Sequence, residues 1–195
     1  MNEQAEVQLL IQAPMLLAYS LALPLLVPLF YDAELAIAVP MTQVAMFGML
    51  VRTMTFPMSY LPLSHGDSKI YMIQEGIYDL LFALFVVVGY KIAGLLGVGV
   101  AMAAAFVLDW VVVYLFACNK YSFRFASGIY ACFALQALIF VIMMVAMRVY
   151  ESGWGYWCCG LACVLLSSLL SLYLLSKRMS YVGRLLNRIK RVLRW

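Results

Sequence analysis

The chain has 195 residues, of which 67% are hydrophobic and only 11% are charged, and its formal net charge is +4. A soluble domain of this size has about a quarter of its residues charged. Only a lipid solvent makes this composition stable, so the sequence predicts an all-α, polytopic membrane protein. The positive charge then bears on membrane topology and does not indicate a nucleic-acid partner.

Six segments are long and apolar enough to cross the hydrocarbon core, which needs about 20 predominantly apolar residues per helix. In chain order they cover residues 7–30, 36–62, 70–90, 95–118, 127–147 and 154–175. The connections between them are short and carry turn or charge signals. The sequence therefore predicts one bundle of six transmembrane helices over residues 1–175.

The basic residues divide unequally between the two sides of such a bundle. One side, which holds both termini because the number of spans is even, collects Lys69, Lys120, Arg124, Lys177, Arg178, Arg184, Arg188, Lys190, Arg191 and Arg194. The other side has only Lys91 and Arg148, while Arg52 lies within a span. Because cytoplasmic loops are enriched in Lys and Arg, we expect both termini in the cytoplasm. Residues 176–195 are expected to form a basic amphipathic helix that lies on the anionic lipid surface.

Four ionisable residues lie inside the predicted spans, namely Arg52, Glu75, Asp79 and Asp109. Such residues are expensive in lipid and usually face a bundle interior or an aqueous cavity. From the helical rise, Arg52 lies about 15 Å, and Asp79 and Asp109 about 13 Å, from the cytoplasmic ends of their spans. Three charges on three helices are therefore expected at one level near the membrane centre, with Glu75 closer to the surface, about 7 Å deep.

Two interpretations of these charges stay open. In the first, Arg52 pairs with an aspartate of a neighbouring helix, and the pair fixes how the helices pack. In the second, the charges line a polar lumen that carries an anionic or polar substrate, or a coupling proton. Gly48, Thr55 and Ser59 share the helical face of Arg52 and give it a small and polar character that favours a lumen. The candidate lumen residues are Arg52, Ser59, Glu75, Tyr78, Asp79 and Asp109.

Four glutamines lie in or near the spans: Gln8, Gln12, Gln43 and Gln136. A single amide in a membrane helix is more often a contact between helices than a ligand. We therefore predict that these amides join neighbouring helices. Gln43 lies opposite Arg52 on its helix and is not grouped with it.

Enzymatic chemistry finds little support in the sequence. The only histidine, His65, lies in a loop, and its spacing to Asp67 is too short for a histidine–aspartate acyltransferase motif. The five cysteines have no metal-ligand spacing with a histidine, and no serine lies in a G-x-S-x-G turn. We expect no enzyme activity, no catalytic residue, no metal and no cofactor.

Several segments resemble, in order, the second half of bacterial polysaccharide transporters, the O-antigen (lipid-linked oligosaccharide) flippases. The segments are NEQAEVQLLIQAP, LVPLFYDAEL, VRTMTFPMSYLPLSHGDSKIYMIQE and GLLGVGVAMA, and together they cover most of the chain. The resemblance implies one lobe of a fold shared with multidrug exporters, in which two six-helix bundles face a central cationic cavity. It also implies flipping of undecaprenyl-pyrophosphate-linked oligosaccharide across the bacterial inner membrane by alternating access. On this basis Arg52 is the cationic candidate, and Asp79 and Asp109 are its partners or proton-coupling groups.

The chain departs from that family in lacking the N-terminal bundle. We expect a fragment of a transporter, and two copies that together rebuild the cavity are the other arrangement. The expected partners are thus the lipid-linked oligosaccharide, membrane lipids, and the missing N-terminal bundle or a second copy. The alternative functions are a cation-coupled multidrug exporter of the same superfamily, and a non-transporting scaffold or inactive truncated remnant.

Overall fold

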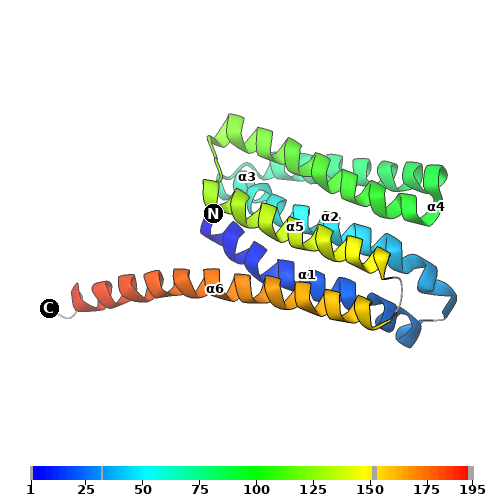
Figure 1. Ribbon diagram of the computed structural model, residues 1–195. Coiled ribbons are helices and arrows are strands. Elements are labelled where there is room, and N and C mark those ends of the chain that lie inside the picture. The colour runs from blue at the N-terminus through cyan, green and yellow to red at the C-terminus, as the bar shows by residue number, and fades with distance from the viewer. Residues whose placement is uncertain (1, 32, 151–152, 193–195) are drawn as a thin grey trace.

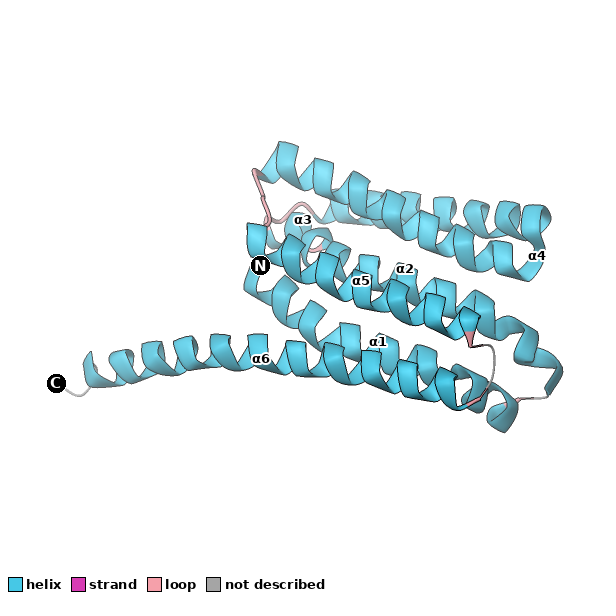
Figure 2. Ribbon diagram, viewed as in Figure 1, coloured by secondary structure: helices cyan, strands magenta, loops and turns pink. Residues whose placement is uncertain are grey.

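The computed structural model describes residues 2–31, 33–150 and 153–192, with side chains described except at residues 33 and 177–192. Over these residues the chain is almost entirely helical and forms no strand (Figure 2). The elements are α1 (Asn2–Phe30), the 3-10 helix η1 (Ala33–Ala38), α2 (Val39–Ser59), α3 (Leu61–Ser64), α4 (Ser68–Tyr121), α5 (Ser127–Val149) and α6 (Trp154–Val192) (Figure 1). The predicted all-α class is confirmed.

Five helical stretches among the described residues are long and apolar enough to span a membrane, whereas the sequence predicts six. They are Asn2–Phe30, Glu34–Ser64, Ser68–Tyr121, Ser127–Val149 and Trp154–Ser176. The numbers differ because α4 contains two predicted spans in one element of 54 residues. Ala93 and Gly94 have non-helical backbone angles within it, and the chain doubles back at this point (Figure 1). α4 is therefore a hairpin of two arms, residues 68–92 and 95–121.

Gly94 makes this reversal possible. Its φ of 60° and ψ of −141° lie in a region that is essentially restricted to glycine. Farther from the turn, a Cβ at Gly89 would lie 2.6 Å from the Cβ of Ala101 in the other arm. Small residues let helix backbones approach closely in lipid, where van der Waals packing drives association. The glycines thus account both for the turn and for the contact between the arms.

α2 occupies the middle of the bundle, between the α4 hairpin and α1 (Figure 1). α1 also packs against α6 and α5, and α5 packs against α6. The core where these helices meet contains the fully buried side chains of Leu9, Leu17, Leu50, Met54 and Phe140. α2 is therefore the element that connects α4 to the rest of the structure.

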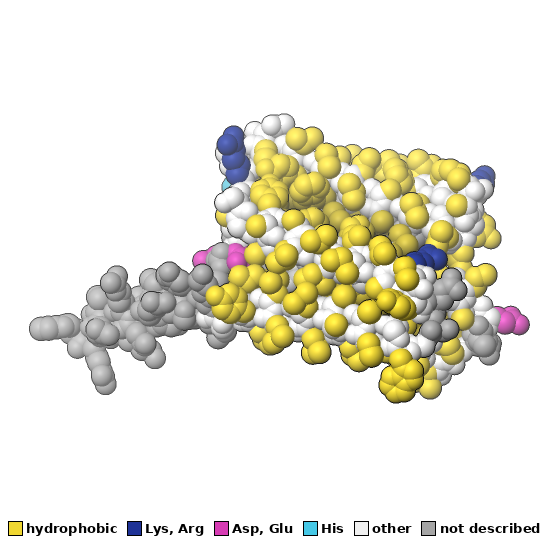
Figure 3. Space-filling view, in the orientation of Figure 1, with side chains coloured by type: hydrophobic (Ala, Val, Ile, Leu, Met, Phe, Trp, Pro, Cys, Tyr) yellow, Lys and Arg dark blue, Asp and Glu magenta, His cyan; other side chains and the backbone are white. Residues whose placement is uncertain are grey.

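The charged residues lie at the two ends of the bundle, apart from those inside the spans. Asn2 donates a hydrogen bond from Nδ2 to the carbonyl oxygen of Arg124 at 3.3 Å, which places the start of α1 beside the α4–α5 connection. Lys91 lies near the turn of the α4 hairpin and Arg148 in the last turn of α5, at the other end. Figure 3 shows basic side chains at both ends and a largely hydrophobic surface between them. The amphipathic character predicted for residues 176–195 depends on side chains outside the described ones.

Candidate functional site

Arg52 lies half-buried in the seam between α2 and α4, where three aromatic rings surround it. Its guanidinium carbon is 4.5 Å from the ring centroid of Tyr78, 5.2 Å from that of Phe106 and 5.5 Å from that of Phe56. Nη1 of Arg52 also donates a hydrogen bond to the hydroxyl oxygen of Tyr78. α2 supplies Arg52 and Phe56, and the two arms of α4 supply Tyr78 and Phe106. The charge is therefore stabilised by cation–π contacts, which are strongest where water is excluded.

No acid forms an ion pair with Arg52 in the part of the chain that the structure describes. Asp109 is half-buried on the second arm of α4. Its carboxyl interacts electrostatically with Arg52, which has the opposite charge, and with Glu75, which has the same charge. Asp79 lies next to Tyr78 in the sequence, but its side chain is exposed. The structure therefore brings together Arg52, Tyr78 and Asp109, with Glu75 nearby, and leaves Asp79 outside this group.

A cavity of about 80 Å³ lies between the two arms of α4, beside this group. Its polar lining comes from Gln74, Tyr78 and Asp109, and its remaining walls are apolar, including Phe82 and Leu108. A volume of this size holds a few water molecules when polar groups are present to bind them. The cavity walls are almost entirely apolar, so Gln74, Tyr78 and Asp109 supply its few polar atoms.

The small and polar face that accompanies Arg52 on α2 is packed within the protein. A Cβ added at Gly48 would lie 2.7 Å from the Cα of Ala103 on α4. Thr55 is buried, and the Ser59 hydroxyl donates a hydrogen bond to the Thr55 carbonyl oxygen at 3.1 Å. Ser59 and Thr55 thus lie in helix packing, and the hydroxyl proton of Ser59 is used by its own helix.

The prediction that glutamines join helices is confirmed for three of them. The pairs are Gln12 with Thr53, Gln43 with Tyr156 and the Ser20 carbonyl, and Gln136 with Ser167 and Ser171. Gln136 is fully buried, and its Oε1 accepts from Ser167 at 2.6 Å while its Nε2 donates to Ser171 at 3.0 Å. Both of its amide atoms are satisfied within the protein, so Gln136 acts in helix packing.

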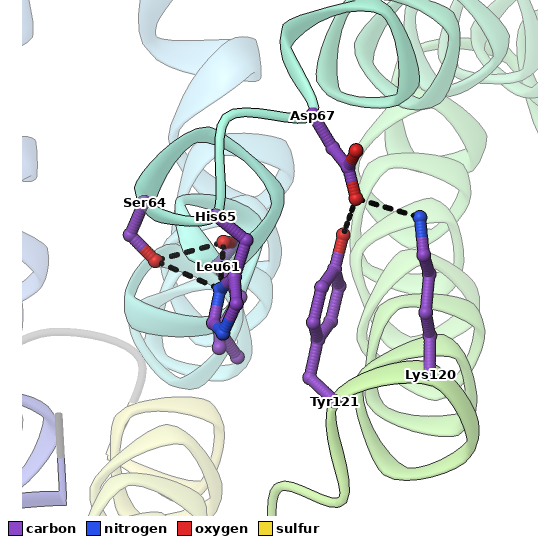
Figure 4. Close-up of polar contacts among 6 residues, drawn as sticks. All are labelled: Leu61, Ser64, His65, Asp67, Lys120 and Tyr121. Carbon is purple, nitrogen blue, oxygen red and sulfur yellow. Dashed lines mark hydrogen bonds and ion pairs between the residues drawn. The ribbon is translucent and has the colours of Figure 1, made fainter.

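A second polar cluster closes the open end of the α4 hairpin (Figure 4). Lys120 Nζ lies 2.7 Å from Asp67 Oδ2, and the Tyr121 hydroxyl donates to the same oxygen at 2.9 Å. The His65 ring packs against that of Tyr121, with 4.6 Å between centroids. The hydrogen bond from Lys120, and then the one from Tyr121, hold the pKa of Asp67 below its usual value. The cluster joins the start of one arm to the end of the other.

The aromatic partners of Arg52 are the functional candidates that sequence reasoning missed. Phe56 follows Arg52 by one helical turn, a spacing that places both on one face and could have indicated the contact. Phe106 carries no such signal, because its position depends on how α4 is rotated against α2. The same holds for the pairing of Asp67 with Lys120, which joins residues far apart in the sequence.

Comparisons with known proteins identify no relative. No family model matches the sequence, and no curated protein or solved structure matches it either.

Proposed function

We propose that the chain is one six-helix lobe of a flippase that moves undecaprenyl-pyrophosphate-linked oligosaccharide across the bacterial inner membrane by alternating access. The observation that carries the proposal is the state of Arg52, a cation within a span whose close partners are aromatic rings and a phenol. A guanidinium without an ion pair keeps its charge available for an anionic ligand. The diphosphate of the lipid carrier is such a ligand.

The geometry of the guanidinium suits phosphate oxygens. Arginine has five N–H donors in a planar fork that matches phosphate. The Tyr78 hydroxyl accepts from Nη1 and orients the fork, which leaves further donors for a ligand. In a site of low dielectric, each of these charge-assisted bonds is stronger than in water.

The length of α4 supports six crossings. A straight helix of 54 residues would extend about 80 Å, whereas the hydrocarbon core is about 30 Å thick. Each arm alone extends about 37–40 Å, which is enough for one crossing. With the arms counted separately, the chain has six crossings, and both termini lie on the side rich in Lys and Arg, the cytoplasm.

The distribution of polar groups supports a bundle with one lipid-facing side. Between Ser127 and Met147 and between Trp154 and Ser176 the sequence has no charge, and its one amide, Gln136, is fully buried. The exposed side chains here are mainly large and apolar, and include Leu138, Val141, Ile142, Val145, Leu161, Leu165, Leu166, Leu169 and Leu172. The surface in Figure 3, where α5 and α6 lie in front, is accordingly hydrophobic. We assign this side to lipid and the α2–α4 side to the cavity and the second lobe, which is an N-terminal bundle or a second copy.

Binding of radiolabelled farnesyl pyrophosphate to the purified chain in detergent tests the proposal. Hydrogen bonds to a charged group contribute about 1.5–3 kcal/mol, so Arg52→Ala should raise the Kd about 10- to 150-fold. Arg148→Ala, which removes an exposed arginine at the end of α5, should leave the Kd unchanged. Farnesol, which has the same tail without phosphate, should not compete.

A double variant separates ligand binding from charge balance. If Arg52→Ala with Asp109→Ala restores the affinity that Arg52→Ala alone has lost, Arg52 only offsets a buried carboxylate and the proposal fails. The proposal also fails if the chain binds tetraphenylphosphonium and not farnesyl pyrophosphate, a result that favours the cation-coupled multidrug exporter.

A further inference from the structure

An exposed carboxylate, Asp79, lies on an apolar surface of the first arm of α4. The neighbouring side chains on this surface are strongly exposed, with fractions of 71% for Met72 and 75% for Leu80. By the helical rise, Asp79 lies about 16 Å from the start of the arm and about 20 Å from its end. It is therefore close to the centre of any membrane that the arm crosses, where acids are rare and are normally paired or hydrated.

No basic side chain that the structure describes pairs with Asp79. Among the described residues, Asp79 takes part in no ion pair or hydrogen bond. Arg52, which lies far from the ends of its span, is turned toward the rings of Tyr78 and Phe106. Glu75, one turn before Asp79, adds a like charge. A cationic partner for the carboxylate is therefore not supplied by the described part of the chain.

The surface around Asp79 is shaped for close approach of a helix. Gly76 precedes Asp79 by three residues and Ala83 follows it by four, so the three lie on one helical face. A Cβ built on Gly76 would meet nothing within 4 Å, and Ala83 is exposed. Small residues on a membrane helix let the backbone of another helix approach closely, and polar side chains can bond across such a contact.

We propose that the face of α4 formed by Gly76, Asp79 and Ala83 docks a transmembrane helix of another polypeptide segment that carries an arginine or lysine near the membrane centre. Only a helix can cross lipid as a single segment with its backbone satisfied, and a basic side chain neutralises Asp79. A second copy of this chain fits this face less well, because Arg52 of that copy lies among its own aromatic rings and its Asp79 would repel. The inference needs only that α4 crosses a membrane, and it is independent of the proposed substrate.

Energy transfer in liposomes tests the proposal directly. The purified chain carries a donor dye, and a synthetic polyleucine helix of about 20 residues with one central arginine carries the acceptor. The arginine peptide should bind about 3- to 15-fold more tightly than an all-leucine peptide of equal length. Asp79→Asn should reduce this difference to nothing, whereas Glu75→Gln and the charge-preserving Asp79→Glu should retain most of it. Gly76→Leu should weaken binding of the arginine peptide while Asp79 stays in place.

Two results would overturn the inference. One is the absence of an effect of charge. This is seen if the native chain binds both peptides equally, or if Asp79→Asn, with a thermal melt like that of the native chain, still prefers the arginine peptide to the same degree. The other comes from Asp79→Cys in a variant whose five native cysteines are replaced. If a membrane-impermeant maleimide labels this cysteine and the arginine peptide does not protect it, the Asp79 face lines a water-filled space.

Discussion

Replacing Gly48 by alanine should open the seam between α2 and α4. The new Cβ would lie 2.7 Å from the Cα of Ala103 and 2.8 Å from Cδ2 of Phe106. Non-bonded carbons pack at about 3.5–4.0 Å, so the helices must separate by about 1 Å. Ala103 contributes a backbone atom and cannot move aside alone, and overpacking of this kind costs about 1–3 kcal/mol.

Gly76→Ala is the matched control, because a Cβ at Gly76 meets nothing within 4 Å. Both substitutions replace a helical glycine by alanine and gain the same helix propensity, up to about 1 kcal/mol. The difference between the two variants therefore isolates the steric cost at Gly48. For a chain of this size, about 1–3 kcal/mol corresponds to a difference in Tm of about 2–12 °C.

The measurement is a thermal melt of the two purified variants in the same detergent, followed by tryptophan fluorescence as the temperature rises. Gly48→Ala should melt at least about 2 °C below Gly76→Ala. Because Phe106 also packs over Arg52, Gly48→Ala should in addition weaken binding of farnesyl pyrophosphate. Equal melting temperatures would show that α2 and α4 do not meet at Gly48, and the geometry of the Arg52 site would then be wrong.

Three further predictions concern other contacts of the fold. Gln136→Leu should lower the free energy of unfolding by about 1–2 kcal/mol, measured by the same melt, because it removes two buried hydrogen bonds between helices. Gly94→Ala should cost about 1–3 kcal/mol in that assay, since its backbone angles are closed to alanine, and a melt identical to that of Gly76→Ala would contradict the hairpin turn. The pKa of Asp67 is lowered in the folded chain. Its contact with Lys120 therefore contributes stability at pH values above the unfolded-state pKa of about 3.9. This contribution is lost as the pH falls through the folded-state pKa. Limited proteolysis of the α3–α4 loop should therefore accelerate in Asp67→Asn at pH 7, and native cleavage should approach that rate only in strong acid.

Some helix ends could be predicted because they follow from a one-dimensional property, whereas α1 starts five residues earlier than predicted and α6 continues to Val192. Hydrophobicity and charge along the chain placed the third connection at Lys91 and Gly94, where the α4 hairpin turns. The same signals placed the start of α5 at Ser127 and that of α6 at Trp154. Membrane thickness limits each span, so composition alone determines where a crossing can begin and end.

The partners of Arg52 could not be predicted, because they depend on how each helix is rotated about its axis. Counting residues gives depth, and by depth Asp79 lies level with Arg52. Tyr78 and Asp79 differ by one residue and therefore by about 100° around the helix, and only Tyr78 turns toward α2. The hydrophobic pattern of the first arm does not reveal this rotation, since apolar residues occur on all its sides. The face of Gly48 and Ser59, interpreted as favouring a lumen, is packed for the same reason.

The hairpin form of α4 also bears on how the chain enters the membrane during synthesis. Its turn is only a few residues long, so the second arm starts on the side of the membrane where the first arm ends. On the proposal that each arm crosses the membrane once, Lys91 and the turn are carried across together. The first arm holds Glu75 and Asp79, whereas the second begins with the apolar and small segment that follows Gly94. On the same proposal, the apolar second arm packs beside the first and offsets the cost of placing the two acids of the first arm in the bilayer.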